Sequence, residues 1–459
     1  MTRLTASLTS AMVLLGPAAP VRASSPAASA RTLDDVHSLT SAALRERRIP
    51  GLSLVILRGD DVLLSRGYGF AEAGQAQRVS ASTVFQLGSI GKQFLAALIL
   101  RLAEEGRLSL DDAVNRHLPD FTQLPPEVRV RRLLSHTSGV RELFTMPAYQ
   151  AGIEDLGRRP EDLAQIVRQA PVDFPPGSRW SYSNTNYTIL AILVERLTGK
   201  PYEQALGDSL FRPLGLRSLR QCTPLPHEPD EARGHVLRKD DVVPAAPENM
   251  NWIRGDGGLC GNALDLARWT RLLTSGRVLR PDSYRAMSAP TRLADGREVD
   301  YGFGLSLVGF DGRRKVAHNG AMLGFSASVA FYPDAGLTVA VLCNRGDVRT
   351  ESIERGIARR LLGLPTPSLR AQALPEQLKR EVAGTYDIGV FPVRVVDRGE
   401  RLWLEMPPPG PTTPLRYLGE RAFAGEADPD AYRLDFGGEG ANHLRLFMGA
   451  MHWYGVRSR

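Results

Sequence analysis

LGSIGKQF, residues Leu87 to Phe94, decides the fold, because two incompatible structures could begin with it. GSIGK resembles an altered phosphate-binding loop, whereas a serine three residues before a lysine can begin an acylation site; both need a strand that turns into a helix. A Walker-type phosphate loop also needs a glycine at the position of Gln86 and a serine or threonine at that of Gln93. Both mismatches remove groups that hold phosphate or magnesium, so the acylation site is favoured.

The chemistry of an acylation site fits Ser89 and Lys92. In a helix beginning at Ser89 the two side chains share one face, so the amine can reach the hydroxyl. The helix N-terminus favours an oxyanion and a lowered lysine pKa, and a neutral Lys92 could act as the base that a serine nucleophile needs. Lysine is rare here: five residues among 57 basic ones, with Lys92 the only one before Lys200. Arginine cannot give up a proton near neutral pH, although a general preference for arginine codons is an alternative explanation.

Two later stretches carry groups that such a site needs. PPGSRWSYSNTNY, residues 175–187, contains Tyr182-Ser183-Asn184, and HNG, His318-Asn319-Gly320, lies on an expected strand. A tyrosine beside a cationic lysine could act as a phenolate base, and Asn184 could bind an acyl-amide carbonyl. Taken alone, Tyr182 would be an ordinary half-buried aromatic and His318 a core histidine. Their joint presence in this order favours a catalytic site.

The hydrophobic patterns predict an α/β (α+β) fold. A helix at 33–48 precedes two strands at 52–58 and 61–72, and a mostly helical region extends to about residue 290. Strand-like runs follow between residues 301 and 344. Strands at both ends with helices between them predict one antiparallel sheet with helices packed on it. After a Pro/Leu/Ala-rich linker at 363–377, short strands spaced by turns predict a small all-β barrel over 378–459.

With these residues in place, the sequence resembles the serine β-lactamase and penicillin-binding-protein superfamily. The similarity is to the branch with class C β-lactamases, D-alanyl-D-alanine carboxypeptidases, D-aminopeptidases and related esterases. It rests on S-x-x-K, Y-x-N and the His-Asn-Gly triplet. It extends over residues 33–362 through five side motifs, which are LLSHTSG at 133–139, LSLDDAVNRHLPDF at 108–121, FRPLGL at 211–216, GGLCGNALDLARW at 257–269 and YGFGL at 301–305. AGTY at 383–386 resembles the lipocalin-like barrels appended to some of these hydrolases.

The resemblance implies a role for each motif residue. Ser89 is expected to be the acylated nucleophile, and Lys92 and Tyr182 the proton-transfer pair, with Tyr182 later activating water. The expected oxyanion hole is the backbone N–H groups of Ser89 and Ala321. The expected substrate-binding residues are Asn184, His318, Asn319 and Gly320, the glycine leaving room for a substrate backbone beside the strand.

The third motif limits the expected substrate. Class C β-lactamases usually have Lys-Thr-Gly there, which favours a substrate carboxylate, whereas His318 should be largely neutral near pH 7 and Asn319 replaces the hydroxyl. We therefore expect an exported serine hydrolase acting on D-amino-acid-containing peptides, amides or esters. A class C-like β-lactamase or a short-chain carboxylesterase is the alternative activity. A binding protein for penicillin or peptidoglycan fragments is the alternative outside enzymes.

Composition adds expectations about location and partners. Residues 1–23 have an early Arg3, an apolar stretch and a Val-Arg-Ala end, which predict a signal peptide before a linker at 24–32 and a periplasmic or extracellular protein. The formal charge of +7 is spread among acids, which does not favour nucleic acid binding. No apolar run is long enough to span a membrane. No HExxH or CxxC spacing suggests a metal, and no cofactor is expected. The three cysteines, Cys222, Cys260 and Cys343, are expected to be buried apolar residues, with at most one disulfide.

Overall fold

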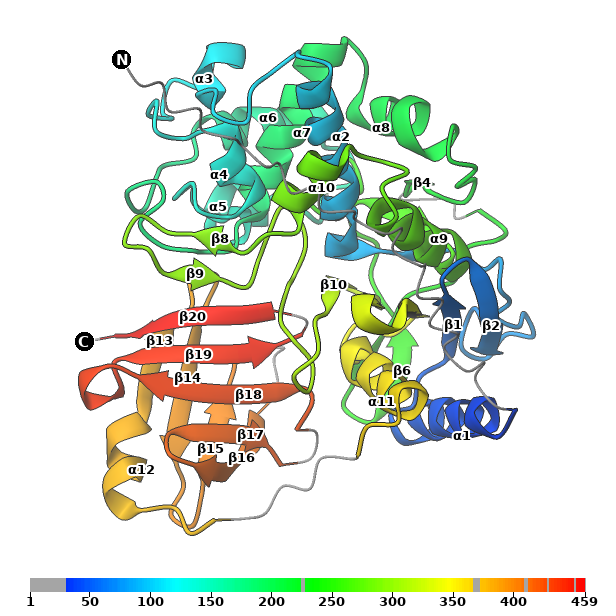
Figure 1. The fold of residues 1–459 in the computed structure, drawn as a ribbon, viewed down its shortest axis with the longest axis vertical. Helices are drawn as coiled ribbons and strands as arrows, with labels where there is room; N and C mark the ends of the chain where they lie inside the picture. The colour runs from blue at the N-terminus through cyan, green and yellow to red at the C-terminus, as the bar shows by residue number, and fades with distance from the viewer. Residues whose placement is uncertain are drawn as a thin grey trace, which may run out of the picture.

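The computed structural model describes residues 30–223, 228–365, 372–407, 412–426, 429–449 and 451–458. The expected signal peptide at 1–23 lies outside the described residues, as do residues 24–29 and 366–371 of the two expected linkers. Figure 1 shows a larger part of helices and strands beside a smaller C-terminal barrel. The expected fold class is confirmed.

The larger part is organised on a five-stranded antiparallel sheet. Its strand order is β10-β11-β12-β1-β2, so strands from both ends of this part meet in one sheet, as predicted. Leu52 lies opposite Cys343 and Arg58 opposite Leu337 in the β1–β12 register. The strands are β1 (Gly51–Arg58), β2 (Asp61–Gly69), β10 (Val316–Met322), β11 (Phe325–Tyr332) and β12 (Leu337–Cys343).

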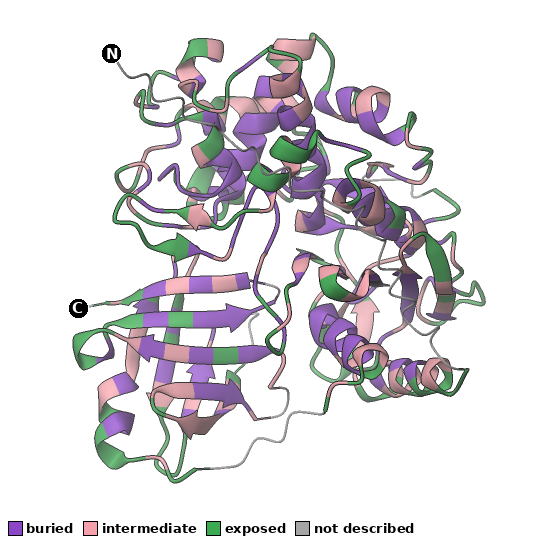
Figure 2. Cartoon of the chain, in the orientation of Figure 1, coloured by how far each residue is buried: buried purple, intermediate pink, exposed green. Residues whose placement is uncertain are grey.

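Helices cover both faces of this sheet. Leu54 and Ile56 pack with α1 (Ala30–Glu46) and α11 (Thr350–Leu362) on one face. The alternate side chains, such as Val55, point to the opposite face and share a core with α2 (Gly91–Glu104) and α9 (Ala263–Thr274). Because both faces are covered, β1 and β12 are buried almost throughout, as Figure 2 shows.

Most of the helices lie between β2 and β10, again as predicted. α2 and α7 are buried on nearly all sides and form the centre of this region. The other helices are short and surround them. The helices are α3 (Val114–His117), α4 (Val130–Leu134), α5 (Pro147–Gln150), α6 (Pro160–Arg168), α7 (Asn184–Thr198), α8 (Tyr202–Leu206) and α10 (Pro281–Met287), and the small strands are β3 (Phe85–Gln86), β4 (Arg220–Gln221), β5 (His235–Arg238), β6 (Asp241–Pro244), β7 (Leu259–Gly261), β8 (Thr291–Arg292) and β9 (Glu298–Val299).

A disulfide joins two strands of the small sheet β3-β7-β4. Cys222 directly follows β4, Cys260 lies in β7, and their Cα atoms are 5.1 Å apart. All three cysteines are buried, as expected; Cys222 and Cys260 form the one disulfide that the sequence allowed, and Cys343 is a free thiol. Gln86 pairs with Cys260 in the register, so the disulfide supports the strand that leads into Ser89.

Loss of this disulfide should destabilise the protein. The bridged cysteines are 38 residues apart, and closing a loop of that length should stabilise the fold by roughly 3–4 kcal/mol. We expect the Cys222→Ala/Cys260→Ala variant to lose free energy of unfolding of that order in urea denaturation. Cys343→Ala is the control, because it removes a buried sulfur but no crosslink. A double variant that is as stable as the parent would contradict the prediction.

The C-terminal part is a closed barrel of eight antiparallel strands, in which β13 pairs with β20. α12 (Glu376–Val382) precedes it. Inward residues such as Tyr386 and Phe423 fill its core, while their neighbours face outward. The strands are β13 (Gly384–Asp387), β14 (Pro392–Asp397), β15 (Leu402–Glu405), β16 (Thr412–Gly419), β17 (Ala422–Gly425), β18 (Tyr432–Gly437), β19 (His443–Met448) and β20 (Met451–Arg457).

Polar contacts attach the barrel to the larger part. His452 Nδ1 is 2.9 Å from an Asp300 carboxylate oxygen, and the Arg359 guanidinium is 2.8 Å from Asp430. The first contact holds β20 against the segment that precedes Tyr301, and the second holds the segment before β18 against α11. The position of the barrel relative to the candidate site is therefore a defined feature of the fold.

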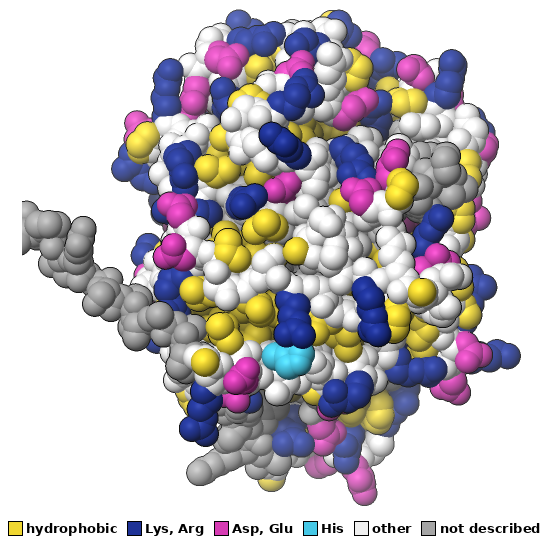
Figure 3. Space-filling model, turned by 90° about the vertical axis from the view of Figure 1, so that its right-hand side faces the viewer, with side chains coloured by type: hydrophobic (Ala, Val, Ile, Leu, Met, Phe, Trp, Pro, Cys, Tyr) yellow, Lys and Arg dark blue, Asp and Glu magenta, His cyan; other side chains and the backbone are white. Residues whose placement is uncertain are grey.

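Charges of both signs are interspersed on the surface. Figure 3 shows basic and acidic side chains side by side on one face of the molecule. Arg271 and Arg277, for example, both pair with Asp60 at the β1–β2 turn. Within the described ranges, no helix combines the length and the apolar character that crossing a membrane requires.

Candidate active site

Ser89 lies in the tight 3₁₀ turn η1 (Gly88–Ile90), between β3 and α2. The expected helix start at Ser89 is therefore wrong by two residues, since α2 begins at Gly91. Gly88 has a positive φ of 54°, which interrupts a regular helix at this point. The turn leaves Ser89 partly exposed while the residues on both sides are buried.

The edge strand β10 lies directly against this turn. A Cβ atom on Gly320 would lie 1.9 Å from the Leu87 carbonyl oxygen, and one on Gly88 would lie 2.7 Å from the Ala321 nitrogen. Gly320 is thus required by the contact between β10 and the turn, a different reason from the expected space for a substrate backbone. The close approach brings the backbone N–H groups of Ser89 and Ala321 near each other, as an oxyanion hole requires.

Lys92 is fully buried, and its amine lies within hydrogen-bonding distance of three oxygen atoms. Its Nζ lies 3.0 Å from Ser89 Oγ, 2.8 Å from Asn184 Oδ1 and 2.6 Å from the Asp256 carbonyl oxygen. Burial lowers the pKa of Lys92 to about 8, against the opposing charges of Asp256 and Glu142. The two carbonyl oxygens can only accept, so a neutral amine donates its two hydrogens to them and points its lone pair at the Ser89 hydroxyl. The geometry thus suits Lys92 to accept the proton of Ser89.

Tyr182 covers the other side of the lysine. Its ring centroid lies 4.9 Å from Lys92 Nζ. Its buried hydroxyl has no hydrogen bond of good geometry among the described residues, although Ser89 is near enough to act on its pKa. Burial raises the pKa of Tyr182 well above 10, Ser89 opposes this, and the charges of Glu142 and Asp256 raise it further. The phenol is therefore protonated at neutral pH, which favours a role as proton donor over the expected phenolate.

Asn184, the first residue of α7, connects the lysine to a buried carboxyl group. Its Nδ2 donates to Glu142 Oε1 at 2.7 Å, and its backbone N–H donates to Glu142 Oε2. Its Oδ1 accepts from Lys92, so protein groups already use the polar atoms of its side chain. Its expected role in binding a substrate amide stays a prediction. The structure shows instead a connected chain from Glu142 through Asn184 to Lys92 and Ser89.

Two carboxyl groups at the site escaped the sequence analysis. Glu142 is 4% exposed and burial raises its pKa. Burial also raises the pKa of Asp256 to about 7, with Lys92 opposing the shift. No sequence spacing identifies either residue, because each comes near Lys92 only through tertiary folding.

His318 is buried and its ring nitrogens are both engaged. Nδ1 lies 2.6 Å from the Asn319 carbonyl oxygen, which can only accept, so Nδ1 carries the proton. Nε2 then accepts from the Tyr301 hydroxyl at 3.0 Å. Burial, with the charge of Lys92 adding to it, lowers the pKa of His318 to about 3. The histidine is neutral, as expected. Both ring nitrogens have protein partners that fix the ring on β10, and its expected role in binding substrate stays a prediction.

The structure thus brings Ser89, Lys92, Tyr182 and Asn184 together around one buried amine. Residues 318–321 border this group along β10, and Asn319 is partly exposed there. His136, which the sequence analysis did not single out, stacks its ring 4.2 Å from that of Tyr182. The arrangement supplies a nucleophile, a proton acceptor, a proton donor and two backbone donors for an oxyanion, which are the parts of an acyl-transfer site.

Comparison with known proteins agrees with this geometry. A family model described as Beta-lactamase matches residues 36–363. The D-aminopeptidase of Brucella canis is 27% identical over 355 residues, which cover 75% of this chain and 65% of that protein. This chain therefore spans less than two-thirds of the length of that relative.

Solved structures extend the comparison. A D-stereospecific amidohydrolase from a Streptomyces species is 26% identical with a TM-score of 0.60, over 72% of this chain and 99% of the other. A penicillin-binding protein homologue from Pyrococcus abyssi is 24% identical with a TM-score of 0.66, over 92% of this chain and 99% of the other. The second similarity extends over most of the chain and supports the fold.

Proposed function

Because the chain belongs to the beta-lactamase family of serine hydrolases, we propose that it hydrolyses D-amino-acid-containing peptides, amides or esters through an acyl-enzyme on Ser89. One observation carries this proposal above the others. Lys92 Nζ lies 3.0 Å from Ser89 Oγ, while two carbonyl oxygens occupy its other hydrogen-bonding directions. A buried amine in this arrangement activates the serine hydroxyl.

Acylation begins when Lys92 Nζ accepts the hydroxyl proton and Ser89 Oγ attacks the substrate carbonyl carbon. The backbone N–H groups of Ser89 and Ala321 hold the resulting oxyanion. The Tyr182 phenol then gives its proton to the leaving amine or alcohol as the carbon–leaving group bond breaks, and the Lys92 ammonium returns a proton to Tyr182. The products of this half-reaction are the ester on Ser89 and the released leaving group.

Deacylation uses the same groups in reverse. Tyr182 and Lys92 together accept a proton from the attacking water, whose oxygen bonds to the acyl carbon. The second oxyanion collapses, the ester bond to Ser89 breaks, and Ser89 Oγ recovers its proton. The buried phenol therefore gives and regains one proton in each half-reaction and needs no lasting phenolate.

The substrate class rests on two observations. The named relatives include a D-aminopeptidase and a D-stereospecific amidohydrolase. The third motif supplies a neutral His318 and the amide of Asn319, so no cation at this triplet attracts the carboxylate of a β-lactam. Both favour uncharged or amine-bearing D-amino acid derivatives over β-lactams.

We further propose that the protein is exported to the periplasm or the extracellular space. The disulfide between Cys222 and Cys260 supports this proposal, since disulfides persist in oxidising compartments. The signal-like residues 1–23 support it independently. Fractionation of cells with an antibody to the mature chain tests it, and an intact N-terminus found in the cytoplasm would contradict it.

A stereochemical comparison tests the activity. Purified protein is incubated with D- and L-alaninamide, D-alanine methyl ester, p-nitrophenyl acetate and a chromogenic cephalosporin, with product release measured for each. We expect D-alaninamide to be cleaved at least tenfold faster than L-alaninamide. Turnover of the cephalosporin alone would establish a β-lactamase, and turnover of p-nitrophenyl acetate alone an esterase. A stable cephalosporin adduct without turnover of any substrate would establish a binding protein.

The pH dependence should report Lys92. We expect kcat/KM for D-alaninamide to rise with pH and to level off above about pH 8, because the neutral amine is the reactive form. The apparent pKa belongs to Lys92, Asp256 and Glu142 together, because their titrations interact. Asp256→Asn removes a negative charge that raises the lysine pKa. The rising, acidic part of the pH profile of kcat/KM should therefore move to lower pH in this variant.

The comparison of variants separates this effect from the titration of the substrate. The amine of D-alaninamide titrates identically in every reaction, so only the difference between variants is interpreted. Asp241→Asn is the control, because Asp241 is exposed in β6 and should leave the rising part of the profile in place. A rising part that stays in place or moves to higher pH in Asp256→Asn would contradict the assignment.

A further inference from the structure

The barrel touches two of the three motifs. The Trp453 ring of β20 lies 5.5 Å from the Tyr182 ring, centroid to centroid. Gly449, which follows β19, lies against the third motif, since a Cβ there would be 2.9 Å from Asn319 Nδ2. One strand pair of the barrel and the residue that follows β19 therefore contact both Tyr182 and Asn319.

Several contacts fix this strand pair in place. Trp453 Nε1 donates to the Met448 carbonyl oxygen at 3.2 Å, which ties β20 back to β19. The next residue toward the N-terminus, His452, pairs with Asp300 at 2.9 Å. Trp453 is 8% exposed, so its ring is packed in place. Moving the ring would require these contacts to break.

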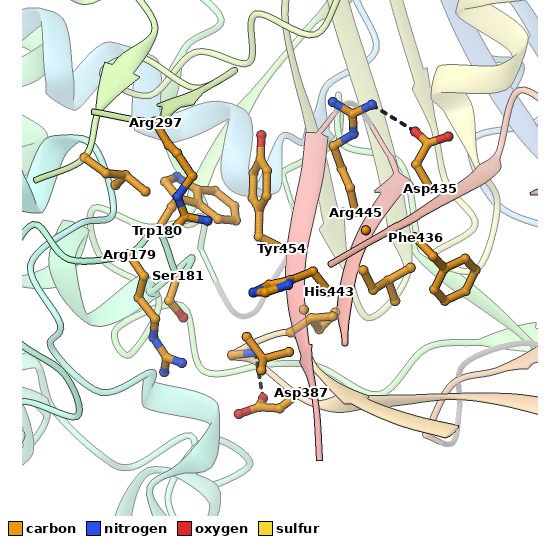
Figure 4. Close-up of a pocket in the computed structure, with 17 residues that line it drawn as sticks. Arg179, Trp180, Ser181, Arg297, Asp387, Asp435, Phe436, His443, Arg445 and Tyr454 are labelled. Carbon is orange, nitrogen blue, oxygen red and sulfur yellow. Dashed lines mark hydrogen bonds and ion pairs between the residues drawn. The ribbon is translucent and has the colours of Figure 1, made fainter. Parts of the chain in front are cut away.

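The next residue along β20 faces elsewhere. Tyr454 lines a separate cavity of about 450 Å³ between the barrel and the segment Arg179–Ser181, shown in Figure 4. No motif residue belongs to the walls of that cavity. Neighbouring residues of β20 thus face different spaces, and Trp453 is the one that adjoins the candidate active site.

The proposed mechanism tells which side of the substrate meets Trp453. Tyr182 protonates the leaving group, so the leaving group lies on the Tyr182 side of the scissile carbonyl. Trp453 packs on that same tyrosine and Gly449 on Asn319 beside it. The barrel therefore lies on the leaving-group side of the scissile carbonyl.

We propose that Trp453 and Gly449 determine specificity by limiting the length of the leaving group, an inference that rests on the proposed function. Substrates that release ammonia, a small alcohol or a single amino acid fit beside Trp453. Longer peptides on the leaving-group side collide with Trp453. The enzyme thus acts on small D-aminoacyl compounds and rejects substrates in which a long peptide follows the scissile bond.

A series with one acyl group and leaving groups of increasing length tests this proposal. D-alaninamide, D-Ala-Gly and D-Ala-Gly-Gly-Gly-Gly are compared by kcat/KM. We expect the parent protein to cleave the pentapeptide at least 100-fold less efficiently than D-Ala-Gly. Trp453→Ala should raise the ratio of pentapeptide to dipeptide efficiency at least tenfold, and Trp453→Phe should raise it by less.

The ratio of kcat/KM for the pentapeptide to kcat/KM for the dipeptide is the decisive readout, because a merely structural defect lowers both values together. Trp403→Ala is the matched control: Trp403 is a partly buried barrel tryptophan in β15 that packs under Arg398, and its variant should keep the parent ratio. Trp453→Phe keeps an aromatic ring and serves if the alanine variant does not fold. Gly449→Asn, which adds bulk toward Asn319 at a residue with φ of 69°, should lower the ratio further.

The outcomes separate this proposal from the proposed function. If the parent protein cleaves no D-alanyl substrate, the proposed function falls. If it cleaves D-alaninamide and the pentapeptide equally well, or if the Trp453 variants keep the parent ratio, only the role of the barrel is overturned. A raised ratio in both Trp453 variants with an unchanged ratio in Trp403→Ala supports it.

Discussion

Ser89→Ala should abolish acylation and reduce turnover by about 10⁴-fold or more, because no other group replaces the nucleophile of a covalent mechanism. The fold should survive, since Ser89 is partly exposed and the change removes one oxygen. The measurement is intact protein mass over time with an activated D-alanine ester, run together with steady-state release of product. The parent protein should gain the mass of one acyl group, and the variant should gain none.

Ser275→Ala is the matched control for this experiment. Ser275 is an exposed serine at the end of α9, so its variant should acylate and turn over like the parent protein. Retained turnover in Ser89→Ala would show that the nucleophile lies elsewhere. An acyl adduct in Ser89→Ala located by peptide mapping on another residue would identify it.

Lys92→Arg should reduce kcat/KM by roughly 10²- to 10⁴-fold, although the positive charge is kept. The guanidinium does not deprotonate near neutral pH and cannot accept the Ser89 proton. Three hydrogen bonds hold the amine in a fully buried space, so the larger group also fits poorly. The measurement is the rate of acylation by the activated ester, with the fold checked by circular dichroism.

Two further variants separate the loss of the base from the change in size. Lys92→Met has a similar length and no charge, and it should lose activity to a similar extent because it also lacks a proton acceptor. Lys200→Arg is the control, since Lys200 is an exposed partner of Asp208 that arginine can replace. Full activity of Lys92→Arg at pH 7 would refute Lys92 as the proton acceptor.

The local patterns predicted the parts of this protein that depend on neighbours in sequence. The serine and lysine of LGSIGKQF are three residues apart, so any tight turn or helix brings them together, and the observed hydrogen bond between them follows. The strand patterns of β1 and β12 are nearly continuous apolar runs, and burying both faces of such strands requires a covered sheet. The turns and alternation after residue 378 likewise predicted the barrel.

The same patterns left out features that depend on distant residues. Cys222 and Cys260 were expected to be buried, with at most one disulfide, and the small sheet brings their Cα atoms within 5.1 Å. Gly320 was expected to make room for substrate, which stays a prediction, and the structure adds that it makes room for the Leu87 carbonyl. In each case the residue type was informative, and the partner that explains it lies far away in sequence.

By itself, the sequence predicted the reactive groups, their order and the class of chemistry, because the proposed nucleophile and proton acceptor, Ser89 and Lys92, are close neighbours in sequence. Only the tertiary structure decided the electrostatic state of the site. Burial lowers the pKa of Lys92, raises that of Tyr182 and brings Glu142 and Asp256 beside the amine. It also placed Trp453 of the barrel against Tyr182. Desolvation and packing depend on every atom that surrounds a group, and those atoms come from segments that no local pattern connects.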